Sequence, residues 1–242
     1  MNSVIRQQRA LITGASSGIG KETALAFAKA GINLVLIGRN QQKLAAVAGM
    51  AADLGVSAQA YPLDLADIPE VAPRIAKIAQ ESGPIDILIN NAGMGYTNSL
   101  ADTPLSDWQR VIDLNLTSVY QCVQGILPAM RQQGGGTIVN VSSIAADNFF
   151  PDWGAYSVSK AGLVAFSRIL AIEERANAIR VTIIIPGAVN TPIWDSDSVK
   201  ADFDRSAMLT PDIIAQAILQ AVLLPKQAVV ETMTIMPSAG AL

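Results

Sequence analysis

The sequence contains no histidine and only one cysteine, Cys122, among its 242 residues. Without histidine the chain cannot build the Ser/His/Asp or Cys/His systems that activate a nucleophile, so the commonest hydrolase mechanisms are excluded. The customary zinc ligands are missing too, and no tight acidic cluster indicates magnesium, so we predict that no metal is bound. A lone cysteine cannot form an internal disulfide. This fits a reducing cytoplasm, and we interpret Cys122 as a small core residue.

Charge is also scarce, because only 15% of the residues are charged, and 17 basic and 20 acidic side chains leave a formal net charge of -3. The charges are interspersed, so no basic stripe faces a phosphate backbone, and we expect no nucleic-acid partner. We find neither a secretory signal nor a stretch approaching the roughly 20 apolar residues of a membrane span, so we expect no membrane association. The hydrophobic half of the sequence predicts a compact core.

Short apolar runs alternate with longer stretches of helical periodicity, the pattern of βαβ units around a parallel sheet. The apolar runs predict strands at 10–13, 33–37, 59–63, 85–89, 137–141, 180–185 and 229–235. The periodic stretches predict helices at 19–30, 41–54, 68–82, 107–130, 155–176 and 211–223. We therefore predict one α/β domain over residues 1–242, a Rossmann-type doubly wound sheet of about seven parallel strands with helices on both faces.

Polar and glycine-rich clusters follow six of the predicted strands. They lie at 14–20, 38–40, 64, 90–93, 142–143 and 186–191. Ligands of doubly wound sheets bind outside the carboxyl ends of the strands, so these clusters predict one elongated cleft.

The first cluster reads Thr13-Gly14-Ala15-Ser16-Ser17-Gly18-Ile19-Gly20. Its glycines let the backbone turn tightly and approach a pyrophosphate, which the N-terminus of the next helix would face. The spacing G-x-x-x-G-x-G differs from G-x-G-x-x-G, and such a loop can be only a tight turn. Its position between a strand and a helix favours a dinucleotide site.

The second predicted strand ends in Gly38 and Arg39, where NAD-binding enzymes usually place an acidic residue against the ribose 2′-hydroxyl. An arginine there can form charge-assisted hydrogen bonds to a 2′-phosphate. We therefore expect NADP(H) to be preferred over NAD(H). The alternative interpretation is a solvated arginine at the start of the next helix.

Tyr156 and Lys160 are four residues apart in a helical stretch, so their side chains share one face. A free tyrosine has a pKa of about 10, and a nearby ammonium group favours the phenolate. The pair is therefore a candidate for proton transfer, although the same spacing also occurs as a half-buried ring beside a solvated lysine.

Taken together, these motifs resemble the short-chain dehydrogenases/reductases. The further motifs that carry the resemblance are Asn90-Asn91-Ala92-Gly93, Asn115 in a long helix, Ser143 thirteen positions before Tyr156, and Pro186-Gly187-Ala188-Val189-Asn190-Thr191. They run from Thr13 to Thr191, so the resemblance covers essentially the whole chain.

The resemblance implies a catalytic tetrad. In it Tyr156 gives or takes the proton, Lys160 lowers the tyrosine's pKa and bonds the nicotinamide ribose, Ser143 orients the substrate oxygen, and Asn115 holds a relay water. Taken singly, Ser143 could be a cap, Asn115 a helix irregularity, and Thr191 a turn residue.

The resemblance also assigns residues to the cofactor, with Asp64 and Leu65 at the adenine and Val189 and Thr191 at the carboxamide. The full set is Gly14, Ser16, Ser17, Gly18, Ile19, Gly20, Arg39, Asn40, Asp64, Leu65, Asn91, Ala92, Gly93, Tyr156, Lys160, Pro186, Gly187, Val189 and Thr191.

Residues 192–210 interrupt the strand–helix rhythm, and we expect them to form a substrate lid. The apolar residues expected near the substrate are Trp194, Phe203 and Met208 in the lid, Phe149, Phe150 and Trp153 before the catalytic helix, and Met94 and Tyr96. They indicate a small hydrophobic carbonyl or alcohol substrate, unless they are core or interface residues.

Within the family the chain is similar to 3-oxoacyl-carrier-protein reductases. Its last residues, 236–242, lack the paired glycine usual there, so we favour a generic ketone or aldehyde reductase. The alternative from a different class is an NADP(H)-sensing protein that has lost catalysis. The resemblance further implies a homodimer or homotetramer, joined through the long helices that contain Asn115 and Tyr156.

Overall fold

A sheet of seven parallel strands forms the centre of the protein. The computed structural model describes residues 7–201, 204–238 and 240. The strands are β1 (Arg9–Thr13), β2 (Asn33–Gly38), β3 (Ala58–Pro62), β4 (Ile87–Asn90), β5 (Gly136–Val141), β6 (Ile179–Pro186) and β7 (Thr232–Ile235). Their order is β3-β2-β1-β4-β5-β6-β7, so the winding reverses between β1 and β4. The predicted Rossmann-type fold is confirmed.

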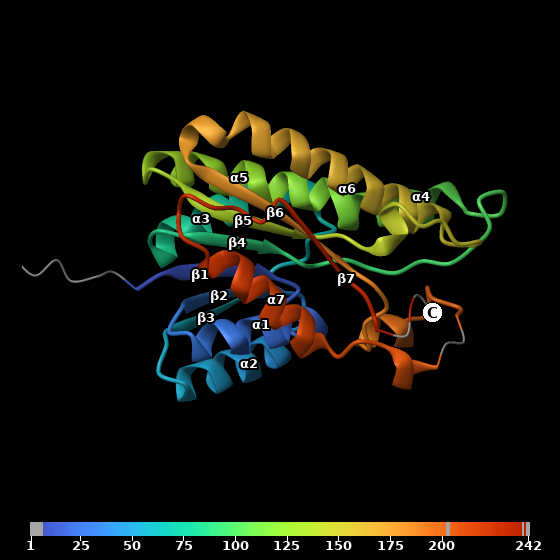
Figure 1. Ribbon diagram of the computed structural model, residues 1–242, viewed down its shortest axis with the longest axis horizontal. Helices are drawn as coiled ribbons and strands as arrows, with labels where there is room; N and C mark the ends of the chain where they lie inside the picture. Colours follow the sequence, from blue (N-terminus) through green and yellow to red (C-terminus); the bar gives the residue numbers. More distant parts are fainter. Residues whose placement is uncertain (1–6, 202–203, 239, 241–242) are drawn as a thin grey trace, which may run out of the picture.

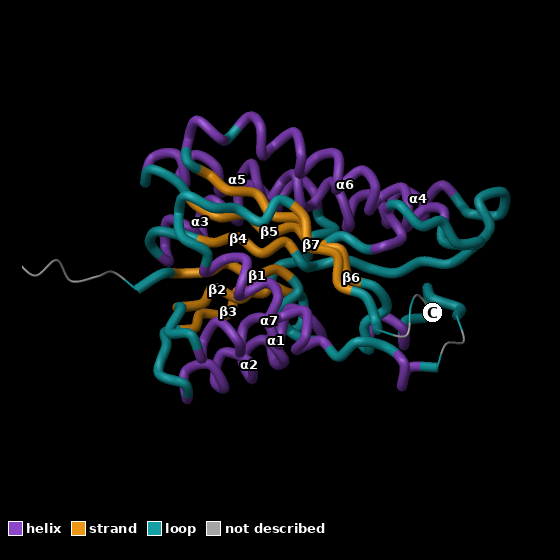
Figure 2. Tube along the Cα trace, in the orientation of Figure 1, coloured by secondary structure: helices purple, strands orange, loops and turns teal. Residues whose placement is uncertain are grey.

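Helices cover both faces of this sheet (Figures 1 and 2). One face carries α1 (Gly18–Lys29), α2 (Gln41–Asp53) and α7 (Pro211–Leu223), and the other carries α3 (Ile68–Ser82), α5 (Ser118–Gln132) and α6 (Gly154–Glu173). Neighbouring residues of β1 therefore enter different cores, because Leu11 packs on the α3 side and Ile12 on the α1 side. This two-sided burial explains why the strands are continuous apolar runs.

The predicted helix at 107–130 is divided in the structure. It consists of α4 (Leu105–Ile112), the π-helical turn η1 (Asp113–Thr117) and α5. Asn115 lies in the π-helical turn and is completely buried. Periodicity alone did not show this turn, because a π-turn shifts the register of a helix without needing glycine or proline.

The short elements and the strand limits differ slightly from the predictions. Single 3₁₀ turns occur at η2 (Ile144–Ala146), η3 (Arg175–Asn177), η4 (Pro192–Asp195) and η5 (Arg205–Ala207). β7 begins at Thr232 rather than at Val229, which is 41% exposed, and β4 begins at Ile87 rather than at Ile85. The architecture is unaffected.

The helix α6 is long and apolar enough to cross a membrane when length and composition alone are considered. We had expected no stretch that approaches a membrane span, so α6 is closer to one in length and apolar composition than expected. Its most apolar window is 44% buried in the structure, and it packs beside β6. Core helices of soluble proteins pass the same test, so the match is weak evidence for a membrane.

Candidate active site

An elongated cavity of about 470 Å³ lies at the carboxyl ends of β1 to β6. The expected convergence of six loops is therefore observed. The predicted site residues that line the cavity are Gly14, Ser16, Ser17, Gly18, Ile19, Arg39, Asp64, Leu65, Asn91, Ala92, Gly93, Ser143, Tyr156, Lys160, Pro186, Gly187, Val189 and Thr191. Gly20, Asn40 and Asn115 are not among the lining residues.

The three glycines of the β1–α1 loop have different roles. Gly14 has a φ of +65°, and a Cβ built there would lie 2.9 Å from the Ala92 Cα. Gly18 has a φ of +52° and lies close to Thr191, with the added Cβ 3.2 Å from the threonine Cβ. Gly20 lies below the surface, because its Cβ would come within 2.3 Å of the Gly14 carbonyl oxygen. It serves packing, which explains its absence from the lining.

Thr13 joins the first loop to the loop after β4, a role that the sequence analysis missed. Its Oγ1 accepts hydrogen bonds from the backbone N–H groups of Asn91 at 3.0 Å and Ala92 at 3.1 Å. In return, Asn91 Nδ2 donates to the Thr13 carbonyl oxygen at 3.1 Å. The one feature of the sequence that could have indicated this role is a threonine at the end of an otherwise apolar strand.

The residues at this end of the cavity fit a dinucleotide. The backbone of the glycine loop lines the cavity without projecting side chains at Gly14 and Gly18, and α1 begins at Gly18 with no side-chain cap from Ser17. Its first N–H groups can therefore meet phosphate. Arg39 is exposed at the end of β2 and lines the cavity. Asn40 lies outside, where its Oδ1 caps α2 by accepting from the Lys43 N–H at 2.9 Å, so its predicted cofactor contact stays a prediction.

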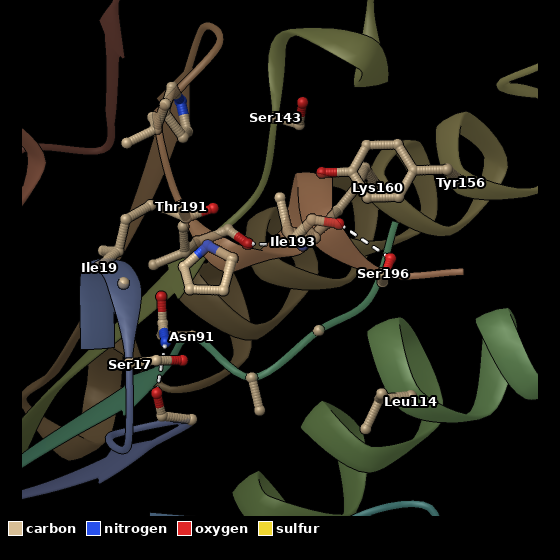
Figure 3. A pocket seen from close by; sticks show the side chains of 18 of the residues that line it. Ser17, Ile19, Asn91, Leu114, Ser143, Tyr156, Lys160, Thr191, Ile193 and Ser196 are labelled. Carbon is tan, nitrogen blue, oxygen red and sulfur yellow. Dashed lines mark hydrogen bonds between the residues drawn. The ribbon is translucent and has the colours of Figure 1, made fainter. Parts of the chain in front are cut away.

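Ser143, Tyr156 and Lys160 come together at the other end of the cavity (Figure 3). The helix α6 supplies Tyr156 and Lys160, and Ser143 follows β5. Lys160 is only 5% exposed; its Nζ donates to the Val141 carbonyl oxygen at 3.0 Å and lies 5.7 Å from the centre of the Tyr156 ring. Ser143 Oγ accepts from the Ala145 N–H at 3.2 Å, so Ser143 is also a cap.

Burial shifts the pKa values of Tyr156 and Lys160. The surrounding walls raise the pKa of Tyr156 above its ordinary value, and a hydrogen bond with the Ser143 side chain opposes this rise. Burial lowers the pKa of Lys160 to about 8, so its ammonium group is mostly charged at neutral pH. The causes of the rise for Tyr156 are burial and the opposing Ser143 hydrogen bond, so the lowering of the tyrosine's pKa by Lys160 stays a prediction.

Asn115 acts from beneath the site, through a network of hydrogen bonds. Its Oδ1 accepts from the Met94 N–H at 2.8 Å, and its Nδ2 donates to the Met94 carbonyl at 3.0 Å and to Ser159 Oγ at 3.1 Å. Ser159 Oγ in turn donates to the Tyr156 carbonyl oxygen at 2.6 Å. The side chain therefore fixes α6 and the loop after β4. Both amide hydrogens are in use, so its role in holding a relay water stays a prediction.

The first residues of the segment 192–210 line the cavity at the end that holds Tyr156. Ile193, Trp194 and Ser196 line the cavity, whereas Met208 is buried and does not, and Phe203 lies outside the described residues. Trp194 Nε1 donates to the Val189 carbonyl oxygen at 2.8 Å. This placement supports the expected lid.

Two of the five other apolar residues expected near the substrate do line the cavity, namely Phe150 and Trp153. Phe149 is 77% exposed and does not. Met94 and Tyr96 belong to a separate hydrophobic cluster, and the Tyr96 hydroxyl donates to Asp107 Oδ2 at 3.1 Å. Met94 and Tyr96 therefore follow the alternative of core residues, because the chain after Gly93 turns toward α4, whereas Phe149 faces solvent.

Comparison with known proteins agrees with this geometry. Residues 8–201 match the family model of the short chain dehydrogenases. The 3-oxoacyl-[acyl-carrier-protein] reductase of Thermotoga maritima is 34% identical over 215 residues, which cover 86% of this chain and 87% of that protein.

Two solved structures are similar over nearly their whole length. The alcohol dehydrogenase of Thermococcus sibiricus, complexed with 5-hydroxy-NADP, has a TM-score of 0.87 at 28% identity and covers 96% of this chain and 97% of that one. A 7α-hydroxysteroid dehydrogenase, complexed with NADH and 7-oxo glycochenodeoxycholic acid, has a TM-score of 0.88 at 30% identity and covers 97% and 94%. The glycine loop, the Tyr156–Lys160 pair and these matches agree that the chain belongs to the short-chain dehydrogenase/reductase family of oxidoreductases.

Proposed function

We propose that the protein is an NADP(H)-dependent reductase of small hydrophobic ketones or aldehydes, which also oxidises the corresponding alcohols. The observation that carries the proposal is one continuous cavity. It has a glycine loop and Arg39 at one end, and Ser143, Tyr156 and Lys160 at the other.

A nicotinamide held in this cavity would supply or accept the hydride, and the chain's own residues bind the carbonyl oxygen and transfer its proton. Reduction leaves negative charge on the carbonyl oxygen, which the Ser143 hydroxyl stabilises by donating a hydrogen bond. Tyr156 Oη donates the proton, and it takes the proton back when an alcohol is oxidised. One N–H of Lys160 is held by Val141, so two remain for the ribose hydroxyls. Its positive charge stabilises the phenolate that Tyr156 leaves behind.

The test of the proton donor is Tyr156→Phe, which keeps the ring and deletes the acid. We expect turnover with NADPH and a carbonyl panel to fall at least roughly 100-fold while cofactor affinity changes little. Lys160→Met should also weaken cofactor binding and should raise the pH at which alcohol oxidation begins. Near-normal carbonyl reduction by Tyr156→Phe would overturn the assignment.

The NADP(H) preference rests on Arg39. The two solved relatives were complexed with an NADP derivative and with NADH, so the likeness itself leaves the choice open. We expect Arg39→Ala to weaken NADPH binding by roughly 10-fold, the scale of one lost charge-assisted hydrogen bond, and to leave NADH binding unchanged. Calorimetric dissociation constants measure both, and Lys29→Ala, an exposed cation on α1, controls for net charge. Equal affinities of the parent protein for the two cofactors would contradict the assignment.

Activity on acyl-carrier thioesters is the second candidate, favoured by the 34% identity to the Thermotoga maritima reductase. The atypical last residues 236–242 count against it, although 239 and 241–242 lie outside the described residues.

The alternative of a sensor that has lost catalysis predicts a different result. Such a protein would bind NADPH but would not oxidise it in the presence of any carbonyl compound of the panel. Turnover with any ketone excludes that alternative.

A further inference from the structure

Three aromatic rings lie in sequence along the substrate end of the cavity. Trp194 of the lid meets Trp153 edge to face, with 5.8 Å between ring centres. Trp153 meets Tyr156 in the same way at 5.3 Å, and all three residues line the cavity. The stack therefore extends from the lid to the proposed proton donor.

Both indoles are held in place before any substrate arrives. Trp194 has its single polar ring atom, Nε1, bonded to Val189, so the rest of the ring presents only carbon. The Trp153 ring lies in edge-to-face contact with both Trp194 and Tyr156, and its backbone is fixed at the beginning of α6, where its carbonyl oxygen accepts from the Ser157 N–H at 2.8 Å. An aromatic surface that is already ordered loses little conformational entropy when a ligand binds to it.

Two of the three ionised groups that line the described part of the cavity lie far from the indoles. The three groups are Arg39, Asp64 and Lys160. The first two follow β2 and β3, and β2 is separated from β6 by four strand spacings of about 4.8 Å, or roughly 19 Å. Lys160 lies beneath the Tyr156 ring and is bound to Val141. A charged substituent on a substrate beside the indoles would therefore lose its water without gaining a counter-ion.

Given the proposed reductase function, we infer that Trp153 and Trp194 form the recognition wall for an aromatic ring on the substrate. The substrate class is then uncharged aryl ketones or aldehydes and the matching benzylic alcohols. An aromatic ring gains an edge-to-face or offset contact with these indoles that a saturated ring of equal size lacks. One such contact corresponds to roughly 2- to 10-fold in binding.

The experiment compares acetophenone with cyclohexyl methyl ketone, which have the same size and differ in the aromaticity of the ring. The variants are Trp153→Leu and Trp194→Leu, and the matched control is Trp108→Leu, since Trp108 packs in the cluster near Tyr96 and does not line the cavity. We expect the ratio of kcat/KM for acetophenone over cyclohexyl methyl ketone to fall roughly 2- to 10-fold in the first two variants and to stay constant in the control.

A second pair of substrates tests the preference for an uncharged ring. Methyl 4-acetylbenzoate should be reduced at least roughly 10-fold better than the anion 4-acetylbenzoate.

Calorimetric binding of acetophenone to the NADP⁺-saturated protein gives a readout that needs no turnover. We expect weaker binding in Trp153→Leu and Trp194→Leu and no change in Trp108→Leu. Ratios that are unchanged in both cavity variants, or equal reduction of the acid and its ester, would overturn the inference while leaving the reductase proposal intact. Acetophenone binding that depends on the indoles, without reduction of any ketone, would uphold the inference and overturn the reductase proposal.

Discussion

Lys160 carries an ammonium group into a nearly closed environment, where 5% of its surface is exposed and its Nζ donates to the Val141 carbonyl oxygen. Burying a charge in this way costs stability, and burial accordingly lowers the pKa of Lys160 from 10.5 to about 8. A residue with such a shift beside a tyrosine in a cavity is typical of a catalytic site.

This shift predicts that the free energy of unfolding depends on pH through Lys160. Below pH 8 Lys160 is protonated in both states, and between about pH 8 and 10.5 the unfolded chain binds more protons than the folded one. The contribution of Lys160 to the free energy of unfolding therefore rises over that range, by on the order of 2 to 3 kcal/mol. In urea denaturation of the cofactor-free protein, the stability of Lys160→Met relative to the parent should fall by this amount from pH 7 to 10. The exposed Lys29→Met should show no such trend, and a constant difference for Lys160→Met would refute the shift.

Side chains whose roles depend on local spacing were predictable from the sequence. Ser143, Tyr156 and Lys160 meet as expected, because the helical repeat and the sheet edge fix their relative positions. The roles of Thr13 and Ser159 were not predictable. Each acts through hydrogen bonds to segments distant in the sequence, and no local pattern encodes such a partner.

At the scale of elements, the π-helical turn and the lid are the features that local patterns describe least well. The turn places Asn115 under Met94 and Ser159, an arrangement fixed by tertiary hydrogen bonds. The lid is attached to the loop after β4 and to the loop after β6. Ser198 Oγ donates to the Gly95 carbonyl at 2.8 Å, and Arg205 contacts the loop after β6.

Arg205 is the side chain on which we expect lid closure to depend. Its Nε donates to Asn190 Oδ1 at 2.9 Å, its Nη2 donates to the Thr191 carbonyl at 3.0 Å, and it pairs with Asp195. Losing these contacts should cost one to two kcal/mol locally, so we expect amides of residues 190–196 to exchange roughly 5- to 30-fold faster in Arg205→Ala.

Hydrogen exchange with mass detection measures this effect, and Arg175→Ala, an exposed arginine of η3, is the control. In the parent protein NADP⁺ and a ketone, which cannot react with each other, should together slow exchange over 192–210, as a lid requires. Protection that is already complete without ligand, and unchanged by Arg205→Ala, would exclude a moving lid.

At the scale of the whole molecule, the fold followed from the alternation of apolar runs and helical stretches. The cavity followed from one rule of parallel sheets, since loops after neighbouring strands meet at one edge. Which aromatic residues face the substrate did not follow. Phe149 and Phe150 are adjacent in the sequence, yet only Phe150 lines the cavity, because the loop's path decides the direction of each ring.

An exposed apolar face on α5 and α6 supports the expected homo-oligomer. Tyr120 is 43% exposed, Ile169 55% and Ile172 69%, and Tyr120 packs edge to face on Phe166 at 6.3 Å. Large side chains so exposed along two neighbouring helices are typical of a protein interface. The exposure also accounts for the membrane-like composition of α6, because these isoleucines belong to the apolar surface of that helix.

We therefore expect the double variant Ile169→Asp/Ile172→Asp to release monomers from the parent oligomer. Each carboxylate would have to be buried without a partner at the symmetric contact. In a two-fold interface both subunits contribute the substituted residues, so this desolvation penalty is incurred twice. Sedimentation equilibrium measures the mass, and circular dichroism checks that the protomer stays folded. Met50→Asp, at an equally apolar and 47% exposed position on α2, across the sheet, is the control and should keep the parent mass. A parent protein that sediments as a monomer of 25.4 kDa, or a double variant that keeps the oligomeric mass, would exclude this face as the interface.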